Sequence, residues 1–213
     1  ATELGVAQSA YGFAAMVAYF FGGPLADRFE PRKPLAGSLW ATALGGLYLA
    51  TFPSVAGVTL VWGFFGLTNI LFFYAALIKA TRSWGGDTQQ GLAYGLLDGG
   101  RGLLAAVLAS VGVFAFSIAF PLGYDAATLP QKAEVLRQVI YGYTAVTAAV
   151  GCVVWFTLRG LDGEQTGEQS APISHFFRQI KHVIRLRVVW LQSTVLICAY
   201  TSYKAFDQYA LFA

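Results

Sequence analysis

Charged residues lie inside apolar runs of this sequence, where an unpaired charge is energetically unfavourable. Asp98 and Arg101 lie three apart in the run GLAYGLLDGGRGLLAAVLASVGVF, so on a helix they share one side and can pair. Lys204 and Asp207 interrupt the last apolar run together with Tyr203. We find no nucleophile elbow, HExxH motif, metal-ligand cluster or phosphate loop. The pattern therefore indicates non-covalent binding of a charged solute, without metal or cofactor, and not an enzyme.

The depth of these polar residues in the membrane determines whether they need a polar partner or a cavity. Arg101 lies about 15 Å from Gly91 on a helix, which is near the middle of a hydrocarbon core of about 30 Å. A charge there costs at least about 2.5 kcal/mol on insertion scales, so Arg101 should face a cavity or a partner. Asp98 and Arg101 can form a purely structural ion pair, or Arg101 can stay partly free for a solute. Asn69 lies at similar depth, where its amide can contact a solute or hydrogen-bond a neighbouring helix.

The composition places these residues in a membrane protein. Hydrophobic residues make up 56% of the chain and charged residues only 12%, whereas soluble domains carry about 25% charged residues. The apolar runs are long and lack the alternation of membrane strands, so we expect an all-α, polytopic membrane helical bundle. Six transmembrane helices are predicted, at residues 4–21, 36–51, 58–78, 91–120, 135–158 and 188–212.

A short charged hinge, residues 22–35 (GGPLADRFEPRKPL), separates the first two runs. Its order of small, acidic and basic residues resembles the loop between helices 2 and 3 of the major facilitator superfamily, a family of membrane transporters. The matching residues are Gly23, Asp27, Arg28, Arg32 and Lys33. Glu30 stands where the family pattern has a second glycine. The resemblance implies that Asp27 helps to close a gate, near the positive end of a helix in the other half of the protein. A simple ion pair in a solvated loop is the alternative.

The resemblance also implies a domain organisation. If the first run is helix 2 of a twelve-helix transporter, residues 1–159 are helices 2 to 6 of the N-terminal half, and residues 188–213 are helix 7. Residues 160–187 then form a cytoplasmic linker, whose apolar residues from Ile173 to Ile184 recur at the spacing of an amphipathic helix on the membrane surface. Neither end resembles a native terminus, so we interpret the chain as an internal fragment without helix 1 and helices 8 to 12.

The distribution of Lys and Arg predicts the orientation. With the hinge 22–35 and the linker 160–187 in the cytoplasm, ten basic residues lie inside and two, Lys132 and Arg137, lie outside. The ten are Arg28, Arg32, Lys33, Lys79, Arg82, Arg159, Arg178, Lys181, Arg185 and Arg187. We expect a multi-pass protein of the bacterial cytoplasmic (inner) membrane.

Two cations from different halves of such a protein favour an anionic solute. Arg101 and Lys204 would hold it between the halves, which loosely resembles the organophosphate/sugar-phosphate antiporter branch. We expect a secondary active transporter, a symporter or antiporter, that moves a small polar, anionic solute by alternating access. A proton on Asp98 or Asp207, or a counter-anion, would be coupled to it. The tyrosines and Lys204 can instead mark an outer interface, and a non-transporting sensor or assembly factor is the alternative function. The partners are the solute and the bilayer, and nucleic acid is not among them.

Overall fold

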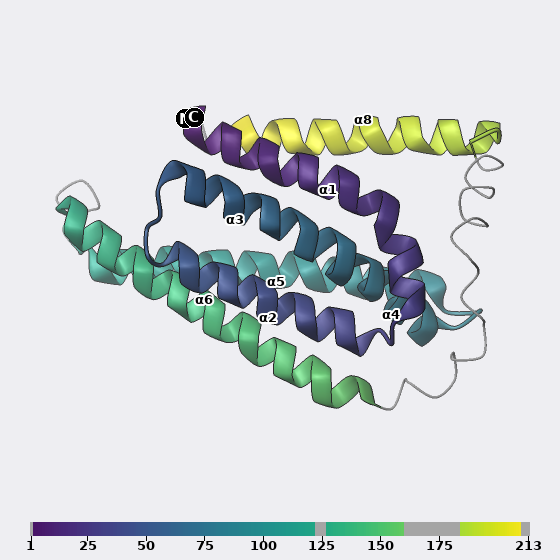
Figure 1. The fold of residues 1–213 in the computed structure, drawn as a ribbon, viewed down its shortest axis with the longest axis horizontal. Helices are drawn as coiled ribbons and strands as arrows, with labels where there is room; N and C mark the ends of the chain where they lie inside the picture. The colour runs from purple at the N-terminus through teal and green to yellow at the C-terminus, as the bar shows by residue number, and fades with distance from the viewer. Residues whose placement is uncertain (1, 122–126, 160–183, 210–213) are drawn as a thin grey trace. The chain divides into compact units, whose positions relative to one another are not determined.

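The computed structural model describes residues 2–121, 127–159 and 184–209, and every regular element in these ranges is a helix (Figure 1). The expected all-helical fold is therefore confirmed. The elements are α1 (Thr2–Arg28), α2 (Arg32–Leu49), α3 (Val55–Leu67), the π-helix η1 (Thr68–Tyr74), α4 (Ala75–Gly85), α5 (Gln90–Ala119), α6 (Leu129–Thr157) and α8 (Arg187–Tyr209).

The chain divides into two compact units, Ala1–Glu168 and Gln169–Ala213. In the second unit the structure describes α8, and the indole nitrogen of Trp190 donates to the carbonyl of Ile184 just before this helix, at 2.7 Å. The amphipathic helix expected in the linker lies almost wholly outside the described residues.

In the part of the chain that the structure describes, three helical stretches are long and apolar enough to cross a membrane. They are Val55–Gly85, which joins α3, η1 and α4 into 31 continuous residues, Gln90–Ala119 and Leu129–Thr157. The helices α1, α2 and α8 occur where the other crossings are expected. Six transmembrane crossings stay a prediction.

The helices α1 and α3 pack closely because the residues between their backbones are small. A Cβ atom on Gly66 of α3 would lie 3.0 Å from the Cβ of Ala14 and 2.5 Å from the carbonyl of Tyr11. The ring of Tyr11 meets that of Trp62 edge to face, with centroids 6.3 Å apart. Gly22, near the end of α1, lies against Ala75 and the backbone carbonyls of η1. The two chain segments run in the same direction.

The helices α2 and α6 run antiparallel and are joined along their length. Gly46 of α2 lies against Thr144 of α6, and Gly151 of α6 lies against the indole of Trp40. At one end the guanidinium of Arg32 lies 5.2 Å from the ring centroid of Trp155.

The other end of this helix pair is held by Arg137. Its Nε donates to the backbone carbonyl of Ala50 at 3.2 Å, just after the last residue of α2. Its guanidinium also lies 5.2 Å from the ring centroid of Phe52, a residue with a φ of 52°. A cationic donor on a C-terminal carbonyl and a cation–π contact both stabilise this helix end.

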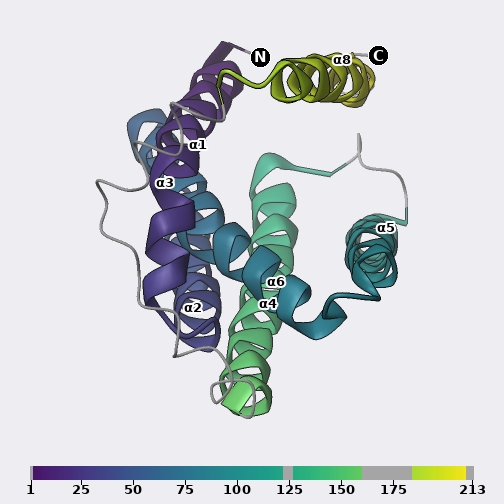
Figure 2. The same cartoon turned by 90° about the vertical axis from the view of Figure 1, so that its right-hand side faces the viewer.

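α5 lies at the edge of the first unit (Figure 2), and Ala93 is its one buried residue. A Cβ on Gly85, at the end of α4, would lie 2.9 Å from the Cβ of Ala93, so α4 and α5 meet closely here. The side-chain amide of Gln90 donates to the Arg82 carbonyl at 3.0 Å and links the two helices across their connection. Further along, the hydroxyl of Tyr143 on α6 donates to the Leu108 carbonyl of α5 at 2.6 Å.

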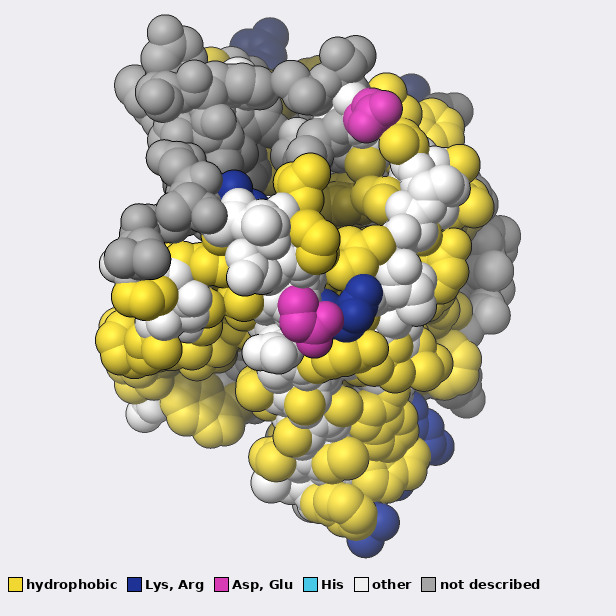
Figure 3. Space-filling model, turned by 90° about the vertical axis from the view of Figure 1, so that its left-hand side faces the viewer, with side chains coloured by type: hydrophobic (Ala, Val, Ile, Leu, Met, Phe, Trp, Pro, Cys, Tyr) yellow, Lys and Arg dark blue, Asp and Glu magenta, His cyan; other side chains and the backbone are white. Residues whose placement is uncertain are grey.

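The connections of the first unit lie at two opposite ends. The α1–α2 and α4–α5 connections share one end, where the Lys79 ammonium donates to the Phe29 carbonyl at 3.4 Å (Figure 1). The α2–α3 connection and the outer ends of α5 and α6 lie at the other. Figure 3 faces that end and shows mostly hydrophobic side chains with few charges.

The expectation of a loop across residues 22–35 is wrong in its extent. Helix α1 continues to Arg28, and α2 begins at Arg32, so the connection is only Phe29–Pro31. The backbone N–H of Lys33 donates to the Glu30 carbonyl at 3.0 Å, and proline is compatible with a helix start. Most of the charged motif is therefore placed on two helix ends.

Candidate functional site

Asp98 and Arg101 form an ion pair on α5. One guanidinium nitrogen lies 3.1 Å from a carboxylate oxygen, and the two side chains are 63% (Arg101) and 65% (Asp98) exposed. The pairing expected from their spacing is confirmed. Arg101 follows the first residue of α5 by about 16 Å along the helix axis. Its depth in the membrane stays a prediction.

The ion pair leaves much of the guanidinium available. Arginine carries five N–H donors, and within the described residues one contact, that to Asp98, is found for Arg101. The carboxylate holds the guanidinium on one side of the helix and balances its charge. Such an arrangement can accept a second anion at the remaining donors.

The glycines of α5 leave the neighbouring face open. No described atom lies within 4 Å of the Cβ positions of Gly91, Gly95 or Gly99. Among the described residues, no other helix therefore packs closely on these glycines. The face beside Asp98 and Arg101 is accessible over about two turns of α5.

Asn69 lies on the π-helix η1, within the continuous stretch from α3 to α4. Its Oδ1 accepts a hydrogen bond of 3.5 Å from the Thr42 hydroxyl of α2, and its side chain is half-buried. Of the two roles considered for Asn69, this contact matches the link between neighbouring helices. Neither the π-helix nor the contact with Thr42 was predicted from the sequence. Wide helical turns of this kind are frequent at functional sites.

The motif that suggested a gate lies at the end shared by the α1–α2 and α4–α5 connections. Gly23, Asp27 and Arg28 belong to the last two turns of α1, and Arg32 and Lys33 open α2. The side chains of the first three are outside what the structure describes. Whether Asp27 acts on a gate stays a prediction.

Glu30 explains how the turn forms without the second glycine of the family pattern. Its carboxylate lies 3.1 Å from the Lys33 ammonium and 3.4 Å from the Arg32 guanidinium. The hydrogen bond from Lys33 has the largest effect and lowers the pKa of Glu30 below its usual 4.5. Burial has the next largest effect and opposes it, and the charges of Lys33 and Arg32 together with the hydrogen bond from Arg32 lower the pKa further. The turn is thus held by charge pairing.

Tyr203, Lys204 and Asp207 lie on α8, in the second unit. The structure describes the helix at these positions but not the side chains. Their approach to Arg101, and with it a shared anion site, stays a prediction.

Comparison with known proteins decides the family. The sequence model described as Major Facilitator Superfamily matches residues 1–212. The chain belongs to the major facilitator superfamily. This is a family of membrane transporters, so the chain is part of an integral membrane protein, as its motif indicated.

Two curated relatives come from Escherichia coli (strain K12). "Inner membrane protein YqcE" is 28% identical over 202 residues, covering 95% of this chain and 45% of the relative. "Inner membrane protein YihN" is 31% identical over 158 residues, covering 73% of this chain and 35% of the relative.

A third relative, from Mycoplasma pneumoniae, is named "Uncharacterized protein MG294 homolog". It is 23% identical over 223 residues, with 98% of this chain and 46% of the relative covered. The chain therefore matches less than half the length of each of these relatives. No solved structure is significantly similar to it.

Proposed function

We propose that the full-length protein is a secondary active transporter that moves a small polar, anionic solute by alternating access between two helical halves. Family membership supports transport, and Arg101 supports an anion. The single observation that carries the anionic choice is a guanidinium with one described partner, mostly exposed, far from both ends of α5. Such a cation is too costly to leave in lipid, so it lines an aqueous path.

The second cation of the site is Lys204, which belongs to the first helix of the other half. Binding between two halves lets both move around one solute. The planar guanidinium suits a phosphate, sulfonate or carboxylate, and the ammonium adds a point charge. Asp98 or Asp207 carries a coupling proton in a symport cycle, and a counter-anion replaces it in an antiport cycle.

The cytoplasmic side is the end that carries the α1–α2 and α4–α5 connections. Arg32, Lys33, Lys79 and Arg82 all lie on helix turns at or near this end, as the positive-inside rule requires. Two relatives are named inner membrane proteins, which supports the bacterial inner membrane as the location. At this end Asp27 contributes to closing the cytoplasmic gate.

Counterflow in proteoliposomes tests the proposal on the full-length protein. Vesicles preloaded with an unlabelled phosphate, sugar phosphate, sulfonate or carboxylate are diluted into the same labelled anion, with a neutral sugar as the comparison. We expect saturable accumulation of one anion, and its loss in Arg101→Gln and in Lys204→Gln. The matched control is Arg82→Gln, an exposed arginine at the end of α4.

Each outcome separates the proposal from its rivals. Full counterflow in both variants would show that Arg101 and Lys204 do not bind the anion. Saturable uptake of the neutral sugar alone would exclude an anionic substrate. Binding of an anion without any counterflow would favour a sensor or assembly factor built on the same helices.

A further inference from the structure

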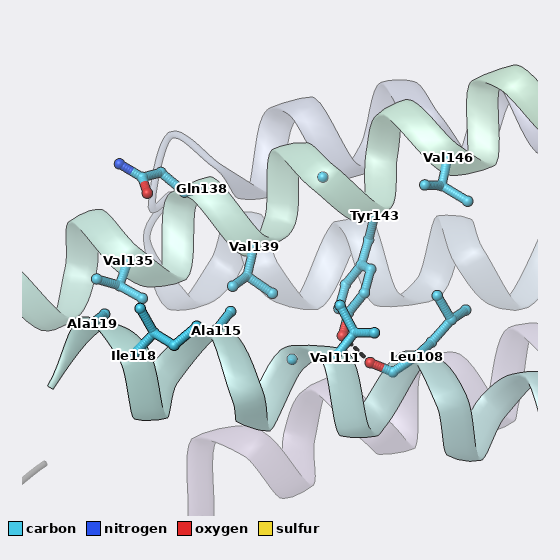
Figure 4. Close-up of a pocket in the computed structure, with 12 residues that line it drawn as sticks. Leu108, Val111, Ala115, Ile118, Ala119, Val135, Gln138, Val139, Tyr143 and Val146 are labelled. Atoms are coloured by element: carbon cyan, nitrogen blue, oxygen red, sulfur yellow. Dashed lines mark hydrogen bonds between the residues drawn. The ribbon is translucent and has the colours of Figure 1, made fainter. Parts of the chain in front are cut away.

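A hydrogen bond joins α5 to α6 within the two stretches that are long and apolar enough to cross a membrane. The ring of Tyr143 crosses from α6 to α5, and its hydroxyl donates to the backbone carbonyl of Leu108 at 2.6 Å (Figure 4). We infer that Tyr143 is a positioning residue for the anion site, because its hydroxyl sets the rotation of α5 and with it the direction of Arg101. This inference rests on the proposed function.

Gly112 of α5 gives the Tyr143 hydroxyl the room that this bond needs. A Cβ on Gly112 would lie 2.6 Å from the hydroxyl oxygen, which is closer than real side chains approach. The next atom of Tyr143, the ring carbon Cζ, would lie 3.7 Å from that Cβ, an ordinary van der Waals contact. The side-chain direction at Gly112 is therefore the direction in which α5 faces Tyr143.

The side chain of Arg101 leaves α5 on this same side. An α-helix turns by about 100° per residue, so the path from Arg101 to Gly112 makes about 1,100°, which is about 20° more than three full turns. The two residues are separated by about 16 Å along the helix axis. The contact with α6 therefore fixes the direction of Arg101 from a distance of about three turns.

Two contacts attach α5 to its neighbours, and Arg101 lies between them. At the start of α5, Ala93 meets Gly85 of α4, and the side-chain amide of Gln90 donates to a carbonyl of α4 at 3.0 Å. Beyond Arg101, the bond from Tyr143 is the second contact. A helix attached at one end can rotate about its own axis, whereas a directional bond further along a continuous helix opposes this rotation.

The side of α5 that meets α6 also faces the other helices of the first unit. In Figure 2 the helices α1 to α4 and α6 all lie to the left of α5. A guanidinium on this side points into the helical half, and rotation of α5 would turn it towards the bilayer, where a charge is unfavourable. Asp98 is on the same helix and turns together with Arg101, so the ion pair at 3.1 Å is kept. Loss of the Tyr143 hydroxyl should therefore weaken anion binding and leave the pair intact.

Tyr143→Phe, which removes only the hydroxyl, tests this inference in the full-length protein. The assay is counterflow in proteoliposomes of the labelled phosphate, sugar phosphate, sulfonate or carboxylate that the wild type accumulates. The half-saturating anion concentration should rise about 3- to 18-fold, the equivalent of one hydrogen bond between membrane helices, with an unchanged maximal rate. A merely stabilising role would lower the amount of folded protein, and with it the maximal rate, at an unchanged half-saturating concentration. The matched control is Tyr141→Phe, an exposed tyrosine of α6 whose hydroxyl makes no hydrogen bond among the described residues; it should keep the wild-type value.

Gly112→Ala breaks the same bond from the other side, because its Cβ displaces the hydroxyl. It should raise the half-saturating concentration as well, and the double variant should show the effect of Tyr143→Phe alone, since the atom that the Cβ would displace is gone. Effects that multiply in the double variant would overturn the inference. If Arg101→Gln abolishes counterflow and Tyr143→Phe keeps the wild-type half-saturating concentration, the inference alone is overturned. A wild type that accumulates none of these anions overturns the proposed function, and the inference with it.

Discussion

Exchanging the two charges of α5 separates a structural ion pair from an anion site. In the double variant Asp98→Arg/Arg101→Asp, the spacing of three residues is unchanged, so the pair seen at 3.1 Å can re-form. The guanidinium, however, moves three residues toward the start of α5, which is about 4.5 Å along the axis. Protein stability should change little, and anion binding should weaken.

The size of the loss follows from this displacement. A hydrogen bond to a charged group contributes about 1.5–3 kcal/mol. A shift of about 4.5 Å exceeds the reach of a hydrogen bond, so this contribution is removed in full. With a tenfold change for each ~1.4 kcal/mol, the half-saturating anion concentration should rise about 10- to 150-fold.

The assay is counterflow of the transported anion in proteoliposomes, measured over a range of concentrations. Thermal unfolding and size-exclusion elution report folding of the same preparation. Wild-type affinity in the exchanged variant would show that Asp98 and Arg101 only orient the helix, and would refute the assignment of Arg101 to the substrate. Loss of folding in that variant would refute the claim that the two residues can exchange positions and still pair.

Three further predictions concern the ends of the helices. Arg137→Met should raise amide hydrogen exchange in the α2–α3 connection about 30-fold, because a charged hydrogen bond and a cation–π contact together contribute about 2 kcal/mol. Glu134→Gln removes only an exposed partner of Arg137 and should leave that exchange unchanged; equal effects would contradict the role of the carbonyl contact. Asp27→Asn should alter turnover more than substrate affinity in transport assays, and unchanged turnover would count against a gate. Because the pKa of Glu30 is lowered in the folded protein, its contribution to stability is present above pH 4.5 and is lost as the pH falls through the lowered value. The protection of amides in the α1–α2 connection, relative to the exchange rate of an unfolded chain at the same pH, should then fall in acid, but not in Glu30→Gln.

Local geometry explains what the sequence predicts well. The Asp98–Arg101 pair depends only on a helix and a spacing of three residues, so it follows from the sequence without knowledge of the packing. The all-helical fold follows from the long apolar runs. The family follows from the motif around Asp27, although the helix there extends seven residues past the expected end at Phe21.

Features that depend on packing were not predicted. The segment TNILFFY is apolar enough for an α-helix or a π-helix, and its wide turn forms where α1 and α2 pack against it. Arg137 contacts a carbonyl 87 positions earlier in the chain, and no local pattern indicates that pairing.

The double attachment of α2 to α6 has a mechanical consequence. An arginine–tryptophan contact at one end and an arginine–carbonyl contact at the other prevent these helices from sliding or splaying independently. During a transport cycle α2 and α6 should move together as one rigid body. Spin labels on α2 and α6 should therefore report one unchanging separation while other helix pairs report two.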